Sequence, residues 1–168
     1  IVVLSGRHFP TGSHKVGPAY SILVEKQLDG ECAPGEHTLV FPSTGNFGIG
    51  GAWVGPRMGY RSRVVLPEEM SAERFEKIRG YGAEVRFTSG VLEDCLAAAT
   101  EFAEQTGASL IHPFDNRDII AGQGTLGLEI VEQLREMGGD DEMPLTVVVP
   151  VGGGGLSSYP HPWLMPNF

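Results

Sequence analysis

A lysine follows a sharp turn near the start of the sequence. Pro10, Gly12 and Ser13 build the turn, and Lys15 comes directly before a segment predicted to be a helix from about Val16 to Leu28. Glycine and serine let the backbone bend sharply. Such a turn can hold an amine in a fixed, partly desolvated position, which lowers its pKa and makes it usable as a nucleophile or base. Most lysines at helix ends are solvated and have no chemical role. Lys15 could therefore be either a reactive amine or an ordinary surface lysine.

A polar loop follows a predicted strand at Ser43, Thr44, Gly45 and Asn46. A loop of this kind that leads into a helix directs hydroxyls, an amide and backbone N–H groups toward one point. It could therefore bind a small carboxylate or phosphate. An ordinary turn capped by serine or threonine explains the same residues equally well.

Four glycines, Gly152, Gly153, Gly154 and Gly155, follow the continuous apolar run from Leu145 to Val151. The run is typical of a strand buried on both faces. Glycines after such a strand let the backbone approach a ligand and offer several N–H donors to an anion. We favour a phosphate site here over a flexible linker.

A second glycine pattern, Gly122 to Gly127, fits the Gly-x-Gly-x-x-Gly form of dinucleotide sites. Such a site requires a strand immediately before it. The preceding residues are the polar loop 115–118 and the short pair Ile119 and Ile120. We therefore interpret these glycines as permitting close packing at the entrance of a helix.

Composition narrows the class of protein. The 168 residues carry a net charge of −9, which argues against nucleic-acid or anionic-membrane partners. Cys32 and Cys95 lie far apart, as buried cysteines in a reducing compartment do, and the five histidines show no metal-binding spacing. No apolar run is long enough to span a membrane. We expect a cytoplasmic protein without a disulfide or metal site.

Apolar periodicity predicts strands that alternate with helices. The predicted strands are 1–4, 37–41, 61–66, 83–87, 109–112 and 145–151. The predicted helices are Val16–Leu28, one ending near Gly59, one from Ser71 to about Gly80, one ending at Gly107, and one carrying Leu126 to Met137. This alternation predicts an α/β fold with parallel sheets covered by helices.

The motifs, in this order, resemble those of the fold-type II, or tryptophan synthase beta-like, pyridoxal-phosphate-dependent enzymes. Pro10 to Lys15 resembles the motif of the cofactor-binding lysine, and Ser43 to Gly48 resembles the family's Ser/Thr-Gly-Asn loop. Gly152 to Leu156 resembles its phosphate-binding glycines. The segment from Pro113 to Thr125 is close to the signature of serine and threonine dehydratases, whereas Leu66 to Arg74 is more similar to cysteine synthases.

The resemblance implies a role for each matched residue. Lys15 would bind pyridoxal 5'-phosphate covalently and then take the substrate's α-proton. Asn46 would hydrogen-bond the cofactor ring hydroxyl, and Ser43, Thr44 and Gly45 would hold the substrate carboxylate. The glycines 152–155 would bind the cofactor phosphate. His14 would approach this phosphate, or be an ordinary loop histidine.

The resemblance also implies a function and an architecture. The leading function is β-elimination from a small L-amino acid, of the serine/threonine ammonia-lyase type. The alternatives are β-replacement of the cysteine-synthase type and an inactive binding or interaction module. We expect a smaller α/β domain at 36–115, and a partial larger, cofactor-binding domain at 1–35 and 116–168. Full-length relatives would be homodimers.

The last residues depart from the family's pattern. An atypical tail at 156–168 includes Pro160 and Pro162, so we expect no regular helix after the glycines. The chain would be a C-terminally truncated fragment with an incomplete larger domain. We therefore expect it to be inactive on its own.

Overall fold

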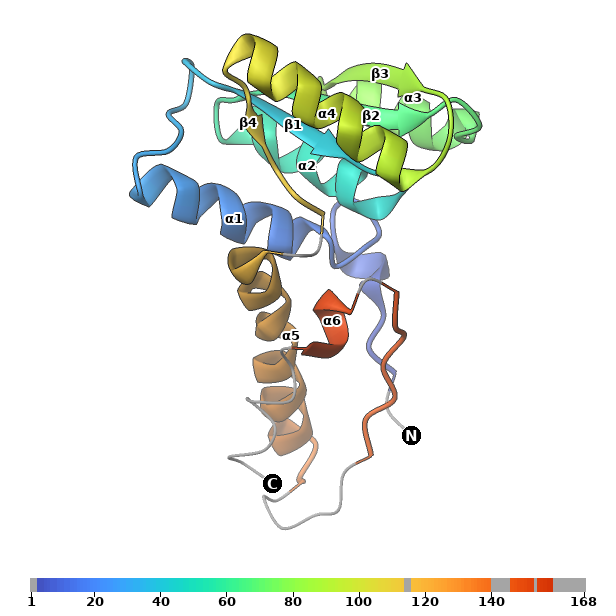
Figure 1. The fold of residues 1–168 in the computed structure, drawn as a ribbon. Helices are drawn as coiled ribbons and strands as arrows, with labels where there is room; N and C mark the ends of the chain where they lie inside the picture. The colour runs from blue at the N-terminus through green and yellow to red at the C-terminus, as the bar shows by residue number, and fades with distance from the viewer. Residues whose placement is uncertain (1–2, 114–115, 140–145, 153, 159–168) are drawn as a thin grey trace.

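The computed structural model describes residues 3–113, 116–139, 146–152 and 154–158 (Figure 1). A single 3-10 turn, η1, spans Gly6–His8. The helices are α1 Val16–Leu28, α2 Asn46–Arg57, α3 Ala72–Gly80, α4 Leu92–Thr106, α5 Arg117–Glu136 and α6 Gly155–Ser158. The strands are β1 Thr38–Pro42, β2 Arg61–Pro67, β3 Glu84–Thr88 and β4 Ser109–Leu110.

The four strands form one parallel sheet in the order β3-β2-β1-β4. In its register, Val40 of β1 lies opposite Arg63 of β2 on one side and Leu110 of β4 on the other. A helix follows each of β1, β2 and β3 and carries the chain back to the start of the next parallel strand. The predicted α/β class and these four strands are confirmed.

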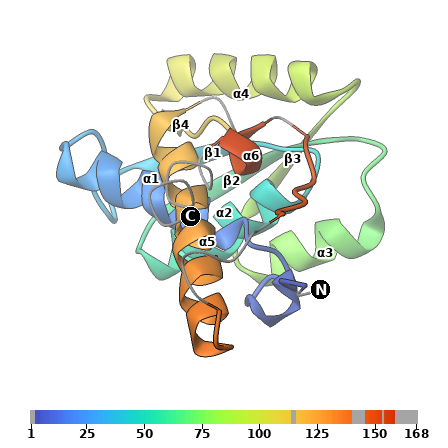
Figure 2. The ribbon, with the colours of Figure 1, turned by 90° about the horizontal axis from the view of Figure 1, so that it is seen from below.

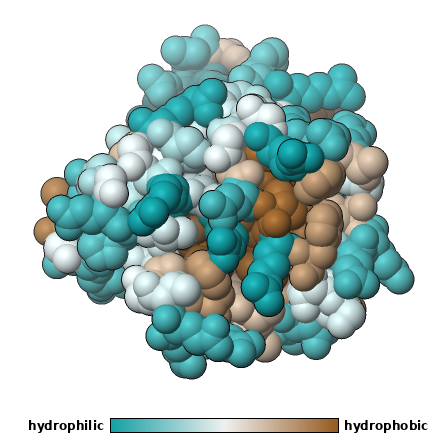
Figure 3. All heavy atoms as spheres, turned by 90° about the horizontal axis from the view of Figure 1, so that it is seen from above, coloured by the Kyte–Doolittle hydropathy of each residue, from teal (hydrophilic) through white to brown (hydrophobic). Residues whose placement is uncertain are grey.

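Helices cover both faces of the sheet because the strand side chains alternate in direction. Leu39 and Phe41 of β1 belong to a core shared with α1 and α2, whereas Val40 packs with Cys95 and Ala99 of α4. Figure 2 shows α4 on one side of the strands, with α2 and α3 on the other. Seen from the α4 side, polar side chains surround a small group of apolar ones (Figure 3).

The sheet edges are short or charged. β3 forms one edge of the sheet. Its Glu84 carboxylate accepts hydrogen bonds from the Arg63 guanidinium of β2, with 3.0 Å between Arg63 Nε and Glu84 Oε2. β4 is the other edge, has only two residues, and is followed three residues later by Pro113.

α1 and α5 pack directly on each other outside the sheet (Figure 1). A Cβ on Gly122 would lie 2.7 Å from both Pro18 Cα and Ser21 Cβ, so only glycine fits this crossing. The predicted close packing is confirmed, but its place at a helix entrance is wrong. α5 begins earlier, because the Asn116 side chain accepts hydrogen bonds from the backbone N–H groups of Asp118 and Ile119 at 2.8 and 3.2 Å.

Two predicted strands do not form in the described residues. Val3 and Leu4 form no strand and are exposed, and residues 146–151 form no strand, with Val148 90% exposed. The prediction that this run is buried on both faces is wrong. The sheet described above makes no strand pairing with either segment, and an apolar run without a hydrogen-bonded neighbour has nothing to bury against. Residues 1–2 and 145 lie outside the described residues.

A short helix follows the glycines, contrary to the prediction. α6 spans Gly155–Ser158 and packs on α5. The rest of the predicted tail, residues 159–168, lies outside the described residues. Within the described ranges, every helix is too short or too polar to cross a membrane. Cys32 and Cys95 are both buried and free, as predicted.

Candidate active site

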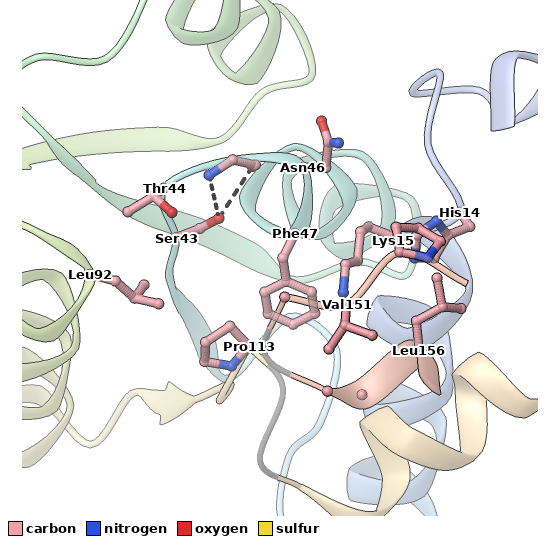
Figure 4. A pocket seen from close by; sticks show the side chains of 15 residues that line it. His14, Lys15, Ser43, Thr44, Asn46, Phe47, Leu92, Pro113, Val151 and Leu156 are labelled. Atoms are coloured by element: carbon pink, nitrogen blue, oxygen red, sulfur yellow. Dashed lines mark hydrogen bonds between the residues drawn. The ribbon is translucent and has the colours of Figure 1, made fainter. Parts of the chain in front are cut away.

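The three predicted ligand loops meet at one cavity of about 360 Å³ (Figure 4). The cavity lies between the ends of β1 and β4, the start of α1 and the segment before α6. Its walls are formed by His14, Lys15, Ser43, Thr44, Gly45, Asn46, Phe47, Leu92, Pro113, Pro150, Val151, Gly152, Gly154, Gly155 and Leu156. Residues more than a hundred positions apart in the sequence thus face the same space.

Lys15 stands at the N-cap of α1 and its side chain extends into the cavity (Figure 4). The chain has three lysines: Lys26 forms an ion pair with Glu31, and Lys77 donates to a backbone carbonyl, so Lys15 alone lines the cavity. Its partial burial lowers the pKa of the ammonium group. More of the amine is therefore neutral near pH 7 than in a solvated lysine.

The backbone of Lys15 is fixed by α2. A Cβ on Gly50 would lie 2.6 Å from the Lys15 carbonyl oxygen, closer than a carbon and an oxygen can approach without displacement. Gly50 therefore lets α2 pack directly on the lysine backbone. This contact joins the helix after the polar loop to the turn that carries the amine.

The Ser43 hydroxyl holds its own loop together. It accepts hydrogen bonds from the N–H groups of Gly45 at 3.1 Å and Gly48 at 2.8 Å, and lies 3.2 Å from the Gly45 carbonyl, to which it can donate. Ser43 is buried, whereas Thr44 is exposed. The exposed Thr44 hydroxyl is thus the more accessible of the two. Asn46 is the first residue of α2 and is also exposed.

The glycine segment forms the opposite wall. Gly152, Gly154 and Gly155 line the cavity, and the carbonyl of Gly154 accepts hydrogen bonds from the hydroxyls of Ser157 and Ser158 at 2.9 and 2.7 Å. Gly153 lies outside the described residues. These bonds fasten the segment to α6 at the edge of the cavity.

The family model of pyridoxal-phosphate dependent enzymes matches residues 4–158. The chain belongs to this family. The match includes all three loops of the cavity, and pyridoxal phosphate is the cofactor after which the family is named.

Several members of the family are similar to the chain in sequence. The L-threonine ammonia-lyase of Thermotoga maritima is 35% identical over 148 residues, which make up 88% of this chain and 34% of that protein. The biosynthetic L-threonine dehydratase IlvA of Corynebacterium glutamicum is 40% identical over 121 residues, 70% of this chain and 27% of that protein. The chain therefore spans about a third or less of the length of these curated relatives.

Solved structures of the family share the fold. A threonine deaminase from T.th. aligns with a TM-score of 0.76 at 35% identity, over 94% of this chain and 48% of that one. An O-ureido-L-serine synthase aligns with a TM-score of 0.84 at 28% identity, over 94% of this chain and 49% of that one. The fold is thus common to a deaminase and a synthase.

A buried nitrogen of His14 tests whether the cavity fits the family's cofactor. His14 Nε2 is shielded from solvent and has no hydrogen-bond partner among the described residues. Burial, and then the Lys15 charge, lower the pKa of His14. A buried imidazole nitrogen without a partner is costly unless a ligand satisfies it. With an amine beside it and glycine N–H groups opposite, the residues fit a ligand that carries both an aldehyde and an anionic group.

Sequence reasoning missed the apolar part of the cavity. Phe47, Leu92 and Val151 line it, but none was assigned a site role. Phe47 is 5% exposed, and its ring packs edge-to-face on Phe41 at 5.9 Å. Phe47 directly follows Asn46, so its sequence position could have indicated that it lines the cavity. Leu92 begins α4, far from the motifs in sequence, and nothing in the sequence indicated its place at the cavity.

Proposed function

We propose that the protein to which this chain belongs catalyses β-elimination from a small L-amino acid, of the serine/threonine ammonia-lyase type. The observation that supports this proposal is the single cavity lysine, Lys15, opposite the glycine segment and beside the Ser43–Asn46 loop. The named ammonia-lyase, dehydratase and deaminase among the relatives support the choice of reaction.

Each wall of the cavity has a part in this proposal. Bound pyridoxal phosphate supplies an electron sink that makes the Cα–H bond of an amino acid acidic. Gly152, Gly154 and Gly155 would hold its phosphate through backbone N–H groups, with His14 Nε2 as a further contact. Asn46 would hydrogen-bond the ring hydroxyl. Gly153 belongs to the same proposal by its place in the sequence.

Lys15 would receive the α-proton at Nζ. Burial lowers the pKa of its amine, so a larger fraction is in the neutral, proton-accepting form than in a solvated lysine at the same pH. Thr44 would hold the substrate carboxylate through its hydroxyl and its N–H group, and Ser43 and Gly45, which hydrogen-bond each other, would form the turn that presents it. Phe47 and Leu92 would limit the access of water to the reacting carbon.

β-Replacement of the cysteine-synthase type is the second candidate. The segment from Leu66 to Arg74 resembles cysteine synthases, and a synthase is among the structural neighbours. The two reactions begin with the same proton removal and differ in whether water or a nucleophile such as sulfide completes them.

The test uses a chain extended to the length of the relatives. We expect keto acid and ammonia to form from L-serine or L-threonine alone, and the Lys15→Ala variant to lose both turnover and the absorbance band of covalently bound cofactor. Lys26→Ala is the matched control, because its amine lies outside the cavity. Product that requires both O-acetyl-L-serine and sulfide would establish replacement instead. Normal turnover in Lys15→Ala would refute the proposal.

The domain division, location and assembly are part of the same proposal. We propose a smaller domain at 36–115 and a larger one formed by 1–35 and 116–168, a cytoplasmic location, and homodimers of the longer protein. An inactive binding module is the remaining alternative. It predicts no borohydride-stable cofactor adduct on Lys15 in any length of chain, and peptide mass spectrometry decides this point.

A further inference from the structure

Three side chains on one face of α3 reach the loops of the cavity. Arg74 and Lys77 belong to α3, and Tyr81 is its C-cap residue, whose backbone is still helical. The three are spaced three and four positions apart, so they lie on the same side of the helix. Each donates a hydrogen bond to a backbone carbonyl of a cavity loop. The accepting carbonyls are those of Thr44 at 3.5 Å, Thr11 at 2.8 Å and Pro10 at 3.3 Å, in that order.

These carbonyls belong to two different loops. Pro10 and Thr11 precede the cavity lysine, whereas Thr44 is in the polar loop after β1. The accepting carbonyls of the two loops are more than thirty residues apart in sequence, and α3 follows both loops. One helix face therefore holds both loops and can fix the distance between them.

A chain of hydrogen bonds continues from Lys77 to the backbone of Lys15. Lys77 Nζ donates to Thr11 O, the Thr11 hydroxyl donates to Ser13 O at 3.3 Å, and the Ser13 hydroxyl accepts from the Lys15 N–H at 3.3 Å. Thr11 is 4% exposed and Ser13 is 7% exposed. The intermediate links are thus shielded from water, which would otherwise compete for them.

We propose that Lys77 is a positioning residue for Lys15, and that the α3 face of Arg74, Lys77 and Tyr81 holds the lysine turn in register with the Ser43–Asn46 loop. The proposal rests on the proposed function, because it takes Lys15 as the reacting amine. The bond from Lys77 is the strongest of the three, since its donor is charged and it is the shortest. Loss of this donor leaves the buried Thr11 carbonyl without its charged partner.

The test compares Lys77→Met with Lys77→Arg in the 168-residue chain. Methionine keeps the length of the side chain but donates no hydrogen bond, whereas arginine keeps the charged donor. We expect hydrogen–deuterium exchange of the Lys15 amide to be about tenfold faster in Lys77→Met, because the turn opens locally more often. Exchange in α4 should stay unchanged, and Lys77→Arg should restore most of the protection.

A second readout concerns the amine itself. At a fixed concentration of pyridoxal phosphate, borohydride fixes the cofactor on lysines, and tryptic peptides separate Lys15 from Lys26. We expect roughly tenfold less adduct on Lys15 in Lys77→Met, at unchanged Lys26 background, with rescue by Lys77→Arg. Lys26→Met, which loses only its ion pair with Glu31, should behave like the native chain.

The outcomes separate the two proposals. Native exchange and native adduct in a folded Lys77→Met variant would overturn the positioning role. A chain extended to the length of the relatives that forms no Lys15 adduct would overturn the proposed function, while the exchange result in the 168-residue chain would still judge the role of Lys77. If Lys77→Met does not fold, Tyr81→Phe removes one donor to the same turn. Its exchange should rise by about threefold, and a native value would refute the proposal.

Discussion

Of two apolar, valine-rich stretches of this protein, one is a buried strand and the other is exposed and forms no strand. In β2, Val64 and Val65 are fully buried, with paired strands on both sides and helices on both faces. In the segment 146–151, Val148 is 90% exposed and forms no strand among the described residues. The two sequences look alike, so the difference shows that an apolar run becomes a strand only where neighbours supply hydrogen bonds and cover.

A matched pair of substitutions gives the largest effect. Val65→Asp places a charge without a partner in the centre of the sheet, and we expect it to lower the free energy of unfolding by more than about 4 kcal/mol. Val148→Asp should change it by less than about 0.5 kcal/mol, because the side chain is already in water. Urea unfolding followed by circular dichroism measures both. Similar losses in the two variants would break the comparison.

Gly50 tests the contact between α2, which packs on the sheet, and the backbone of Lys15. Gly50→Ala forces a methyl group against the Lys15 carbonyl, and we expect a loss of about 1–3 kcal/mol from overpacking. Gly80→Ala is the matched control, since no atom lies within 4 Å of its added methyl group, and it should be neutral or stabilising by up to about 1 kcal/mol. Equal melting temperatures for the two variants would contradict this close contact.

The loop after β1 offers a smaller version of the same comparison, between the buried Ser43 and the exposed Thr44. Ser43→Ala removes the acceptor of two backbone N–H groups, and we expect a cost of about 1–3 kcal/mol. Thr44→Ala, at an exposed position, should change stability by less than about 0.5 kcal/mol. Thermal unfolding compares them. A larger loss in Thr44→Ala would mean that the loop is held by the other hydroxyl.

The smallest effect concerns pH. The pKa of His14 is lowered in the folded chain from 6.5, so below pH 6.5 the unfolded chain binds a proton that the folded chain does not. Stability should therefore fall as the pH drops below 6.5, and level off once the pH is below the lowered pKa. His14→Gln should flatten this slope, whereas His8→Gln, at an exposed histidine, should retain it. An unchanged slope in His14→Gln would refute this assignment.

The sequence predicted the parts of the fold that local patterns determine. Gly107 ends α4 in the left-handed conformation, as expected of a glycine after a helix, and β1 at Thr38–Pro42 lies one residue from its predicted place. Lys15, Asn46 and the glycine segment, which the motifs assigned to a site, line one cavity, and their roles there stay predictions.

Other features depend on distant contacts, which local patterns do not contain. The Ser43 hydroxyl uses its hydrogen-bonding capacity within its own loop, and Leu92 reaches the cavity wall. Both features arise only when the chain has folded. The exposure of Val148 depends on the absence of pairing with the described sheet, not on its own sequence. The early start of α5 is different, because Asn116 is an N-cap residue that could have been recognised in the sequence without any apolar periodicity.

The two edges of the sheet determine how this protein can meet other molecules. The outer strand β3 carries Glu84 and Arg86, and β4 offers only two residues before Pro113 interrupts the backbone donors. Charged side chains on one edge and a very short strand on the other hinder continuation of the hydrogen-bonded ladder by a strand from outside. Fibre growth by edge-to-edge stacking is therefore disfavoured in this sheet, even at high protein concentration.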